Sequence, residues 1–238
     1  MGVLTVVRHG QASMLSADYD KLSELGQDQA RQLGQWWLQR GVAFDDVYSG
    51  PAKRHLGTAR AVCEVWSGDD APGEPEVLPG LDEHDAFGMV MKVVPELSDD
   101  PKIVALHQAL GEATSRKDRS AGFQRLFEAI MVRWLAGDIA HDEVETWPAF
   151  QQRVDAAVDR MLEQCAERGG RTVAFSSVGP IAVMLRRALK TSDLRSFETA
   201  WRLRNASVTT FVFGCGRFTL DSFNVVDHLS DPNHHTFR

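Results

Sequence analysis

Four consecutive residues near the start of the chain carry the groups needed to bind a phosphate and attack it. Residues 3–7 (VLTVV) read as a buried strand, which ends in Arg8-His9-Gly10-Gln11. Arginine offers a planar fork of N–H donors that suits phosphate, and histidine acts as an acid, a base or a nucleophile near neutral pH. Glycine lets the backbone turn close to a bound group. Ligands of open α/β sheets bind at the carboxyl ends of strands, so the segment predicts an anion site there.

Two more segments place suitable residues at strand-to-helix junctions. Residues 49–54 (SGPAKR) follow a short predicted strand at 47–49, and Arg54 falls on the first turn of the helix that follows. Residues 175–180 (FSSVGP) form a similar junction. Backbone N–H groups at both helix starts would favour an anion. The alternative for Arg54 is an ordinary ion pair with a surface carboxylate.

A third segment, Leu81-Asp82-Glu83-His84, supplies carboxyl groups just past a short predicted strand at 77–78. A carboxyl group whose pKa is raised by burial can act as a general acid. The alternative is a solvated acidic loop.

Hydrophobic periodicity indicates the elements that must position these residues. Helices are expected at about 23–40, 51–66, 147–168 and 179–190, and strands at 3–7, 47–49, 172–176, 207–213 and 218–226. Strands that alternate with helices favour a mainly parallel sheet covered on both faces. The expected fold class is therefore α/β, a three-layer α/β/α sandwich with a mainly parallel central sheet and a helical insertion.

The insertion is expected at about 86–145. An apolar stripe there has helical spacing, which is typical of core packing; its members are Phe123, Leu126, Phe127, Ile130, Met131, Trp134 and Leu135. We interpret the stretch as a set of helices lying over the sheet. The whole chain, 1–238, is then a single domain with an insertion.

Composition excludes several classes of protein. The formal net charge is −7, which argues against a general nucleic-acid binder. No apolar run is long enough to span a bilayer, so no membrane partner is expected. The tryptophans and phenylalanines would fit in the core or form a homodimer contact, so a homodimer stays open.

The three cysteines, Cys63, Cys165 and Cys215, are widely spaced and odd in number. This spacing indicates neither a disulfide framework nor a zinc site. The strand predicted at residue 3 leaves no room for a signal peptide. We therefore expect a cytoplasmic protein.

At this point the chain resembles the histidine phosphatase superfamily, which includes the cofactor-dependent phosphoglycerate mutases. Arg8-His9-Gly10 is similar to the signature loop of that family. Residues 48–59 resemble its second arginine motif, and Leu81-Asp82-Glu83 its acid motif. Residues 145–154 and 205–208 resemble later elements, and the matches follow the expected order, with 86–140 the poorly matched part.

The resemblance implies a metal-independent phosphatase with no cofactor, acting on a small phosphorylated metabolite. His9 would form a phosphohistidine, and Arg8 and Arg54 would hold the phosphate oxygens or inorganic phosphate. Glu83 would protonate the leaving oxygen and then assist water. Gln11 would help to bind the phosphate or orient the water.

One residue departs from the family pattern: Ser177 stands where the family has a second histidine. A serine hydroxyl donates one hydrogen bond and carries no charge. Ser177 is thus expected to bind phosphate weakly, which fits either a slow phosphatase or an inactive phosphoester-binding protein. The histidines that could take its place are His84, His55, His107 and His141, and His55 is expected to project from a different side of its helix.

A third reading is a metal-dependent hydrolase that uses the histidines and aspartates of residues 227–235. Those residues have the types found in metal sites but no fixed spacing. A mobile polar terminus is the favoured interpretation.

Overall fold

The structure is a computed structural model that describes residues 1–12, 20–66, 72–168 and 170–237. It divides into two compact units, which are described separately below. The first consists of Met1–Glu83 with Gln151–Arg238, and the second is His84–Phe150. The second unit covers the stretch for which an insertion is expected, with slightly wider bounds.

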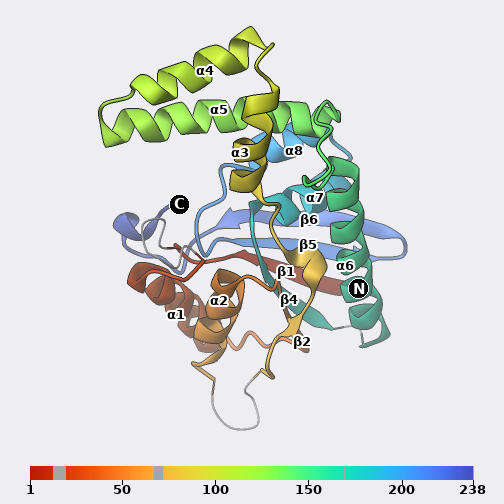
Figure 1. Ribbon diagram of the computed structural model, residues 1–238. Helices are drawn as coiled ribbons and strands as arrows, with labels where there is room; N and C mark the ends of the chain where they lie inside the picture. The colour runs from red at the N-terminus through yellow and green to blue at the C-terminus, as the bar shows by residue number, and fades with distance from the viewer. Residues whose placement is uncertain (13–19, 67–71, 169, 238) are drawn as a thin grey trace. The chain divides into compact units, whose positions relative to one another are not determined.

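A six-stranded sheet forms the centre of the first unit (Figure 1). The strand order is β3-β2-β4-β1-β5-β6, and of these six strands only β5 runs against the others. The mainly parallel sheet expected from the sequence is confirmed. The bounds are β1 Gly2–Arg8, β2 Asp46–Ser49, β3 Glu76–Val77, β4 Arg171–Ser176, β5 Val208–Gly214 and β6 Arg217–Val225.

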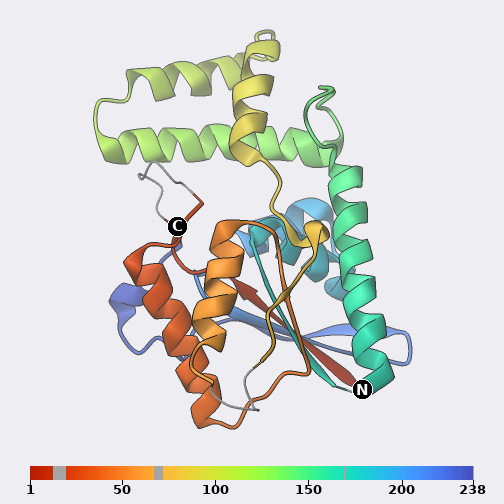
Figure 2. The same ribbon diagram turned by 60° about the horizontal axis from the view of Figure 1, so that its bottom comes forward.

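Helices cover both faces of this sheet, as the three-layer expectation requires. On one face α1 (Glu24–Gln39) and α2 (Lys53–Cys63) lie side by side (Figure 2). On the other lie α6 (Trp147–Arg168) and α7 (Val178–Leu189). Tyr48 of β2 donates to Gln164 Oε1 of α6 at 2.8 Å, and α7 packs on β1 and β6.

The core under α1 and α2 follows from the alternation of strand side chains. Apolar residues of β1, β2 and β4 point to this face and meet the apolar stripes of both helices. The buried cluster consists of Val7, Ala30, Leu33, Trp37, Val47, Ala59, Ala61, Val62, Val173 and Phe175. These contacts fix the strand ends from which the candidate site residues extend.

The helix starts agree with the sequence predictions at α1 but not at α2 and α8. Ser23 caps α1 by accepting from the Gly26 N–H, as a serine before a helix predicts. α2 begins at Lys53, so Pro51 precedes the helix rather than joining its first turn. An eight-residue helix, α8 (Asp193–Ala200), was not predicted; Ser192 caps it.

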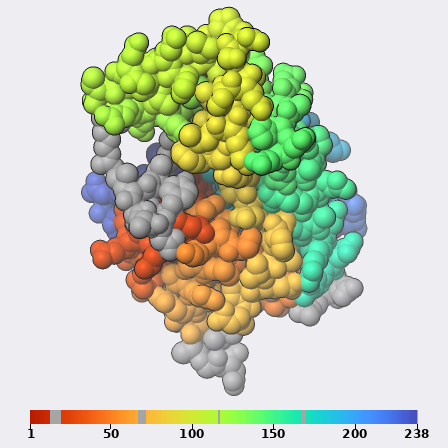
Figure 3. All heavy atoms as spheres, in the orientation of Figure 1, coloured from red at the N-terminus to blue at the C-terminus, as the bar shows by residue number. Residues whose placement is uncertain are grey.

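The second unit is helical, with α3 (Ala86–Glu96), α4 (Pro101–Glu112) and α5 (Arg116–Ala136). α4 and the start of α5 pack together as one block of side chains, seen at the top of Figure 3. Trp134 lies in an aromatic cluster, 5.3 Å from Trp147 and 5.5 Å from Phe150 between ring centroids. The expected stripe on α5 is thus core packing within this unit. That the unit lies over the sheet stays a prediction.

No helix in the described part of the chain has the length and apolar character needed to cross a membrane.

Candidate active site

Three strand ends of the first unit meet at one edge of the sheet. Arg8, the last residue of β1, pairs with Ser176 of β4, and Ser49 of β2 pairs with Phe175. Adjacent parallel strands end together, so the residues that follow each strand are neighbours. The segments singled out from the sequence are therefore brought to the same place.

The loop after β1 is held by hydrogen bonds on both sides. The His9 N–H donates to Ser176 O at 2.9 Å, and the Gly10 N–H donates to Thr58 Oγ1 on α2 at 3.0 Å. A Cβ on Gly10 would lie 2.3 Å from Gly26 O, which no side chain tolerates. Glycine is thus required because the loop passes against the first turn of α1.

His9 is buried, with 8% of its surface exposed, and its ring orientation is fixed. The Nδ1–H donates to the carbonyl oxygen of Gly10 at 2.7 Å, because a carbonyl can only accept. Burial lowers the pKa of His9 well below its usual value, and the charges of Arg8 and Arg54 act in the same direction. The neutral ring therefore carries its lone pair on Nε2, the form that a nucleophilic histidine needs.

The charges of two arginines, Arg8 and Arg54, act on this histidine. Arg8 is buried and donates through Nη1 to Leu203 O at 2.5 Å. Arg54 makes an ion pair with Asp20 Oδ1 at 2.6 Å, and its Nη2 lies 3.4 Å from Ser177 Oγ. Arg54 thus has a carboxylate partner, as the ion-pair alternative expected, and it also contacts the Ser177 hydroxyl.

The acidic loop is fixed to the same strand ends. The Gly179 N–H at the start of α7 donates to Glu83 Oε2 at 3.1 Å, and Ser176 Oγ donates to Leu81 O at 2.7 Å. Arg153 of α6 donates to Gly80 O at 3.2 Å and Asp82 O at 2.9 Å.

Asp82 is the second carboxyl group of this loop. It accepts the Glu83 N–H at 2.9 Å, and burial raises its pKa. The two carboxyl groups are therefore held by defined contacts while they stay partly exposed.

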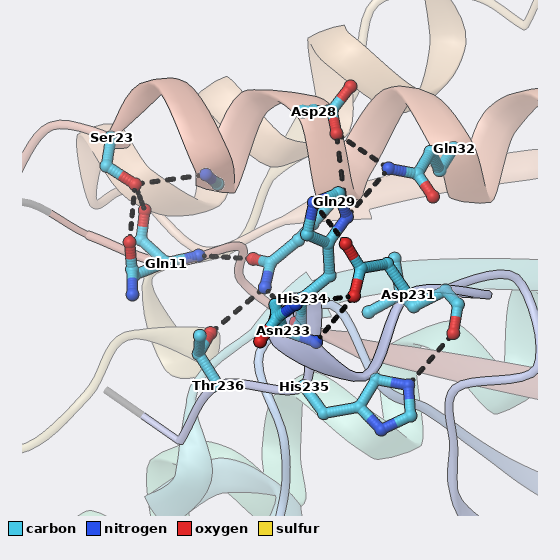
Figure 4. Close-up of polar contacts among 12 residues, drawn as sticks. Gln11, Ser23, Asp28, Gln29, Gln32, Asp231, Asn233, His234, His235 and Thr236 are labelled. Atoms are coloured by element: carbon cyan, nitrogen blue, oxygen red, sulfur yellow. Dashed lines mark hydrogen bonds and ion pairs between the residues drawn. The ribbon is translucent and has the colours of Figure 1, made fainter.

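Gln11 belongs to a hydrogen-bonded network that joins the start of α1 to the C-terminal segment (Figure 4). Its Oε1 accepts from Ser23 Oγ at 2.9 Å, and its N–H donates to Gln29 Oε1 at 2.9 Å. Gln29 is fully buried in α1 and donates to His234 O and Thr236 Oγ1 of the C-terminal segment. A role of Gln11 in phosphate binding stays a prediction.

The same network corrects the expectation of a mobile C-terminal segment. Thr236 Oγ1 donates to Asn205 Oδ1 at 3.0 Å, and Asn205 Nδ2 donates to His9 O at 3.2 Å. His235 Nε2 bonds to Leu229 O at 2.9 Å. The segment is thus linked to the His9 loop through Asn205 and Gln29. No group of three or more potential metal ligands occurs among the described residues, those of the segment included.

His55 is the residue that the sequence reasoning misplaced. Instead of projecting from another side of α2, its Nε2 lies 2.6 Å from Ser177 Oγ, and its ring centroid is 5.7 Å from that of His9. His55 is fully buried and Ser177 is 1% exposed. A buried histidine thus contacts the Ser177 hydroxyl. Direct binding of phosphate by Ser177 stays a prediction.

Comparison with known proteins gives one family and one fold. The sequence profile described as histidine phosphatase superfamily (branch 1) matches residues 4–108 and 109–226. A mutant phosphoserine phosphatase from Entamoeba histolytica, in complex with phosphoserine, is 21% identical with a TM-score of 0.62, over 96% of this chain and 100% of that one.

Two further solved structures agree. A phosphoglycerate mutase from Bacillus anthracis is 20% identical with a TM-score of 0.62, over 95% of this chain and 94% of that one. A mycobacterial glucosyl-3-phosphoglycerate phosphatase complexed with VO3 is 20% identical with a TM-score of 0.59, over 93% and 98%. These likenesses show a shared fold. No curated protein sequence matches the chain.

Proposed function

The chain belongs to the histidine phosphatase superfamily, and from that premise we propose that it hydrolyses a small phosphorylated metabolite through a phosphohistidine on His9. One observation carries the proposal. His9 is neutral, its Nδ1–H is bonded to Gly10 O, and two arginines lower its pKa further. A neutral nucleophile beside fixed positive charge suits attack on a dianionic phosphate.

The reaction proceeds in two displacements. In the first, the Nε2 lone pair of His9 forms a bond to phosphorus while the bond from phosphorus to the leaving oxygen breaks, and the Glu83 carboxyl group gives its proton to that oxygen. In the second, water attacks phosphorus as Glu83 takes a proton from it. The P–N bond breaks, inorganic phosphate leaves, and His9 is neutral again.

Arg8 and Arg54 balance the charge that moves during these steps. A guanidinium binds phosphate oxygens in pairs and keeps its charge at any working pH. Arg8 is oriented by Leu203 O and Arg54 by Asp20, so both are in place before the substrate arrives. Charges fixed in this way stabilise a transition state without reorganisation.

The experiment measures phosphate release with a chelator present from an aryl phosphate, from phosphoserine and from other small phosphate esters. We compare the native chain with His9→Ala and with His228→Ala, a control that removes another buried histidine. Turnover is expected in the native chain and in His228→Ala, and a radioactive phosphate label on histidine only when His9 is present. Turnover that survives His9→Ala would refute the proposal.

A second candidate function rests on Ser177. Because a hydroxyl replaces the cationic donor that the family resemblance leads one to expect, the chain would bind phosphoesters without hydrolysing them. Phosphate binding by a native chain that shows no turnover on any ester would favour this candidate.

The proposed location is the cytoplasm. All three cysteines, Cys63, Cys165 and Cys215, are free thiols, and burial raises the pKa of Cys63 to about 11. Unpaired cysteines are typical of reducing compartments.

A further inference from the structure

His55 and Ser177 form a buried pair beside the candidate nucleophile. The 2.6 Å separation of Nε2 and Oγ is a short hydrogen bond, and both residues are almost wholly removed from solvent. Ser177 precedes the first turn of α7, where a serine side chain usually caps the helix. Here the Ser177 side chain makes no capping bond within the described residues. Its oxygen is used for His55 instead.

The direction of this hydrogen bond follows from the other ring nitrogen. His55 Nδ1 is buried and has no hydrogen-bond partner among the described residues; it faces Gly50. An N–H at that position would be a buried donor without an acceptor, which costs more than an unused lone pair. The hydrogen therefore sits on Nε2, and His55 donates to Ser177 Oγ.

Ser177 Oγ also receives a second donor. Arg54 Nη2 approaches it at 3.4 Å, while Arg54 Nη1 is paired with Asp20. The hydroxyl oxygen has two lone pairs, one for each donor. The guanidinium is therefore held from two sides, by Asp20 and by the Ser177 oxygen that His55 fixes.

The charge state of His55 suits this arrangement. Burial and the charge of Arg54 lower the pKa of His55 to about 3, with Glu83 acting in the opposite direction. His55 is neutral at any working pH and does not repel Arg54.

We infer that His55 is a positioning residue that acts through the Ser177 hydroxyl to hold the Arg54 guanidinium at the phosphate site. The inference deepens the proposed function and rests on it for the role of Arg54. By this role, His55 on α2 compensates for the serine at position 177. The compensation works by orienting a charge that is already present rather than by adding one.

The test measures the affinity for inorganic phosphate by calorimetry, which needs no turnover. His55→Leu removes the donor, and His55→Gln keeps an N–H donor at a similar reach. His228→Leu is the matched control, because His228 is also buried and burial lowers its pKa to about 4. We expect His55→Leu to weaken phosphate binding by roughly tenfold to a hundredfold, and His55→Gln and His228→Leu to stay near the native affinity.

A double-mutant cycle separates positioning from a direct effect. In an Arg54→Ala background, His55→Leu is expected to cause no further loss, because its effect passes through Arg54. The inference would be overturned if folded His55→Leu bound phosphate with native affinity. It would also be overturned if His55→Leu weakened phosphate binding equally in the Arg54→Ala background. If His55→Leu does not fold, Ser177→Ala breaks the same link, and an unchanged affinity there would overturn it equally.

The outcomes distinguish this inference from the proposed function. A native chain that binds phosphate but releases none from esters refutes the proposed phosphatase function. The double-mutant cycle still tests the positioning role of His55 in that case. A native chain whose turnover depends on His9, together with native affinity in His55→Leu, refutes only the inference. A native chain that binds no phosphate refutes both.

Discussion

Replacing Gly50 by alanine should displace His55, although Gly50 is not itself proposed to take part in the chemistry. An added Cβ would lie 2.4 Å from His55 Nδ1 and 2.8 Å from Leu81 O. Ordinary contact begins at 3.4 Å, so the ring has to move by about 1 Å. It cannot retreat along the line to Ser177, since Nε2 is already 2.6 Å from Oγ on that side. The ring must turn sideways, which breaks the hydrogen bond.

The cost of Gly50→Ala has two parts. Forcing atoms into a packed site destabilises a protein by about 1–3 kcal/mol. A shift of about 1 Å in a positioned group can lower activity by about 100-fold, and here it acts through Arg54. Urea unfolding measures the first part, and phosphate affinity with turnover measures the second.

Gly73→Ala is the matched control for this prediction, because its added Cβ has no atom within 4 Å. It should leave stability, phosphate affinity and turnover unchanged. If Gly50→Ala also matched the native chain in all three, His55 would not be confined as described, and the reasoning that links Gly50, His55 and Arg54 would fail.

Three further predictions test the acid, the buried histidine and the second unit. Glu83→Gln should lower kcat by about 100- to 10,000-fold for an alkyl phosphate and much less for an aryl phosphate, whose leaving group needs no proton; equal losses for the two substrates would contradict the role of Glu83 as the acid. The pKa of His55 is about 3 in the folded chain and about 6.5 when unfolded, so its contribution to stability is complete above pH 6.5 and is lost as the pH falls toward 3. One such histidine lowers the free energy of unfolding by about 2 kcal/mol between pH 7 and pH 5. Urea unfolding at both pH values should therefore show a smaller decrease for His55→Gln than for the native chain. An equal decrease in the two would contradict the lowered pKa of His55. Gly122→Ala in the interior of α5 should raise the free energy of unfolding by about 1 kcal/mol, because the new Cβ meets Leu110 Cδ1 at an ordinary 3.4 Å; destabilisation in the same urea assay would show that the site lacks the room.

The sequence was sufficient for features whose signals are local. The apolar run before Arg8 gave β1, Ser23 marked the start of α1, and the alternating strands and helices gave the layered sheet. Each depends on periodicity or on a cap within a few residues. α8 was missed because eight residues are too few for a clear helical period, although Ser192 and Asp193 carry a start signal.

The role of His55 depended on contacts that one helix cannot reveal. Adjacent helical residues differ in direction by about 100°, and this led to the expectation that Arg54 and His55 face different sites. In the structure both reach the Ser177 hydroxyl, at the residue just before α7. The space for the ring comes from Gly50, which lacks a Cβ. The available signal was Gly50, three residues before the helix that carries the unexpected histidine.

The position of β1 has a consequence for how the chain folds. β1 is the first strand in the sequence, yet both its neighbours come late: Val3 pairs with Arg171 of β4 and with Val212 of β5. During synthesis both edges of β1 stay unpaired until β4 and then β5 emerge. Pairings over such long separations close slowly, and meanwhile the unpaired strand edges and exposed apolar side chains can meet wrong partners. We therefore expect slow refolding, and aggregation of fragments that end before β4.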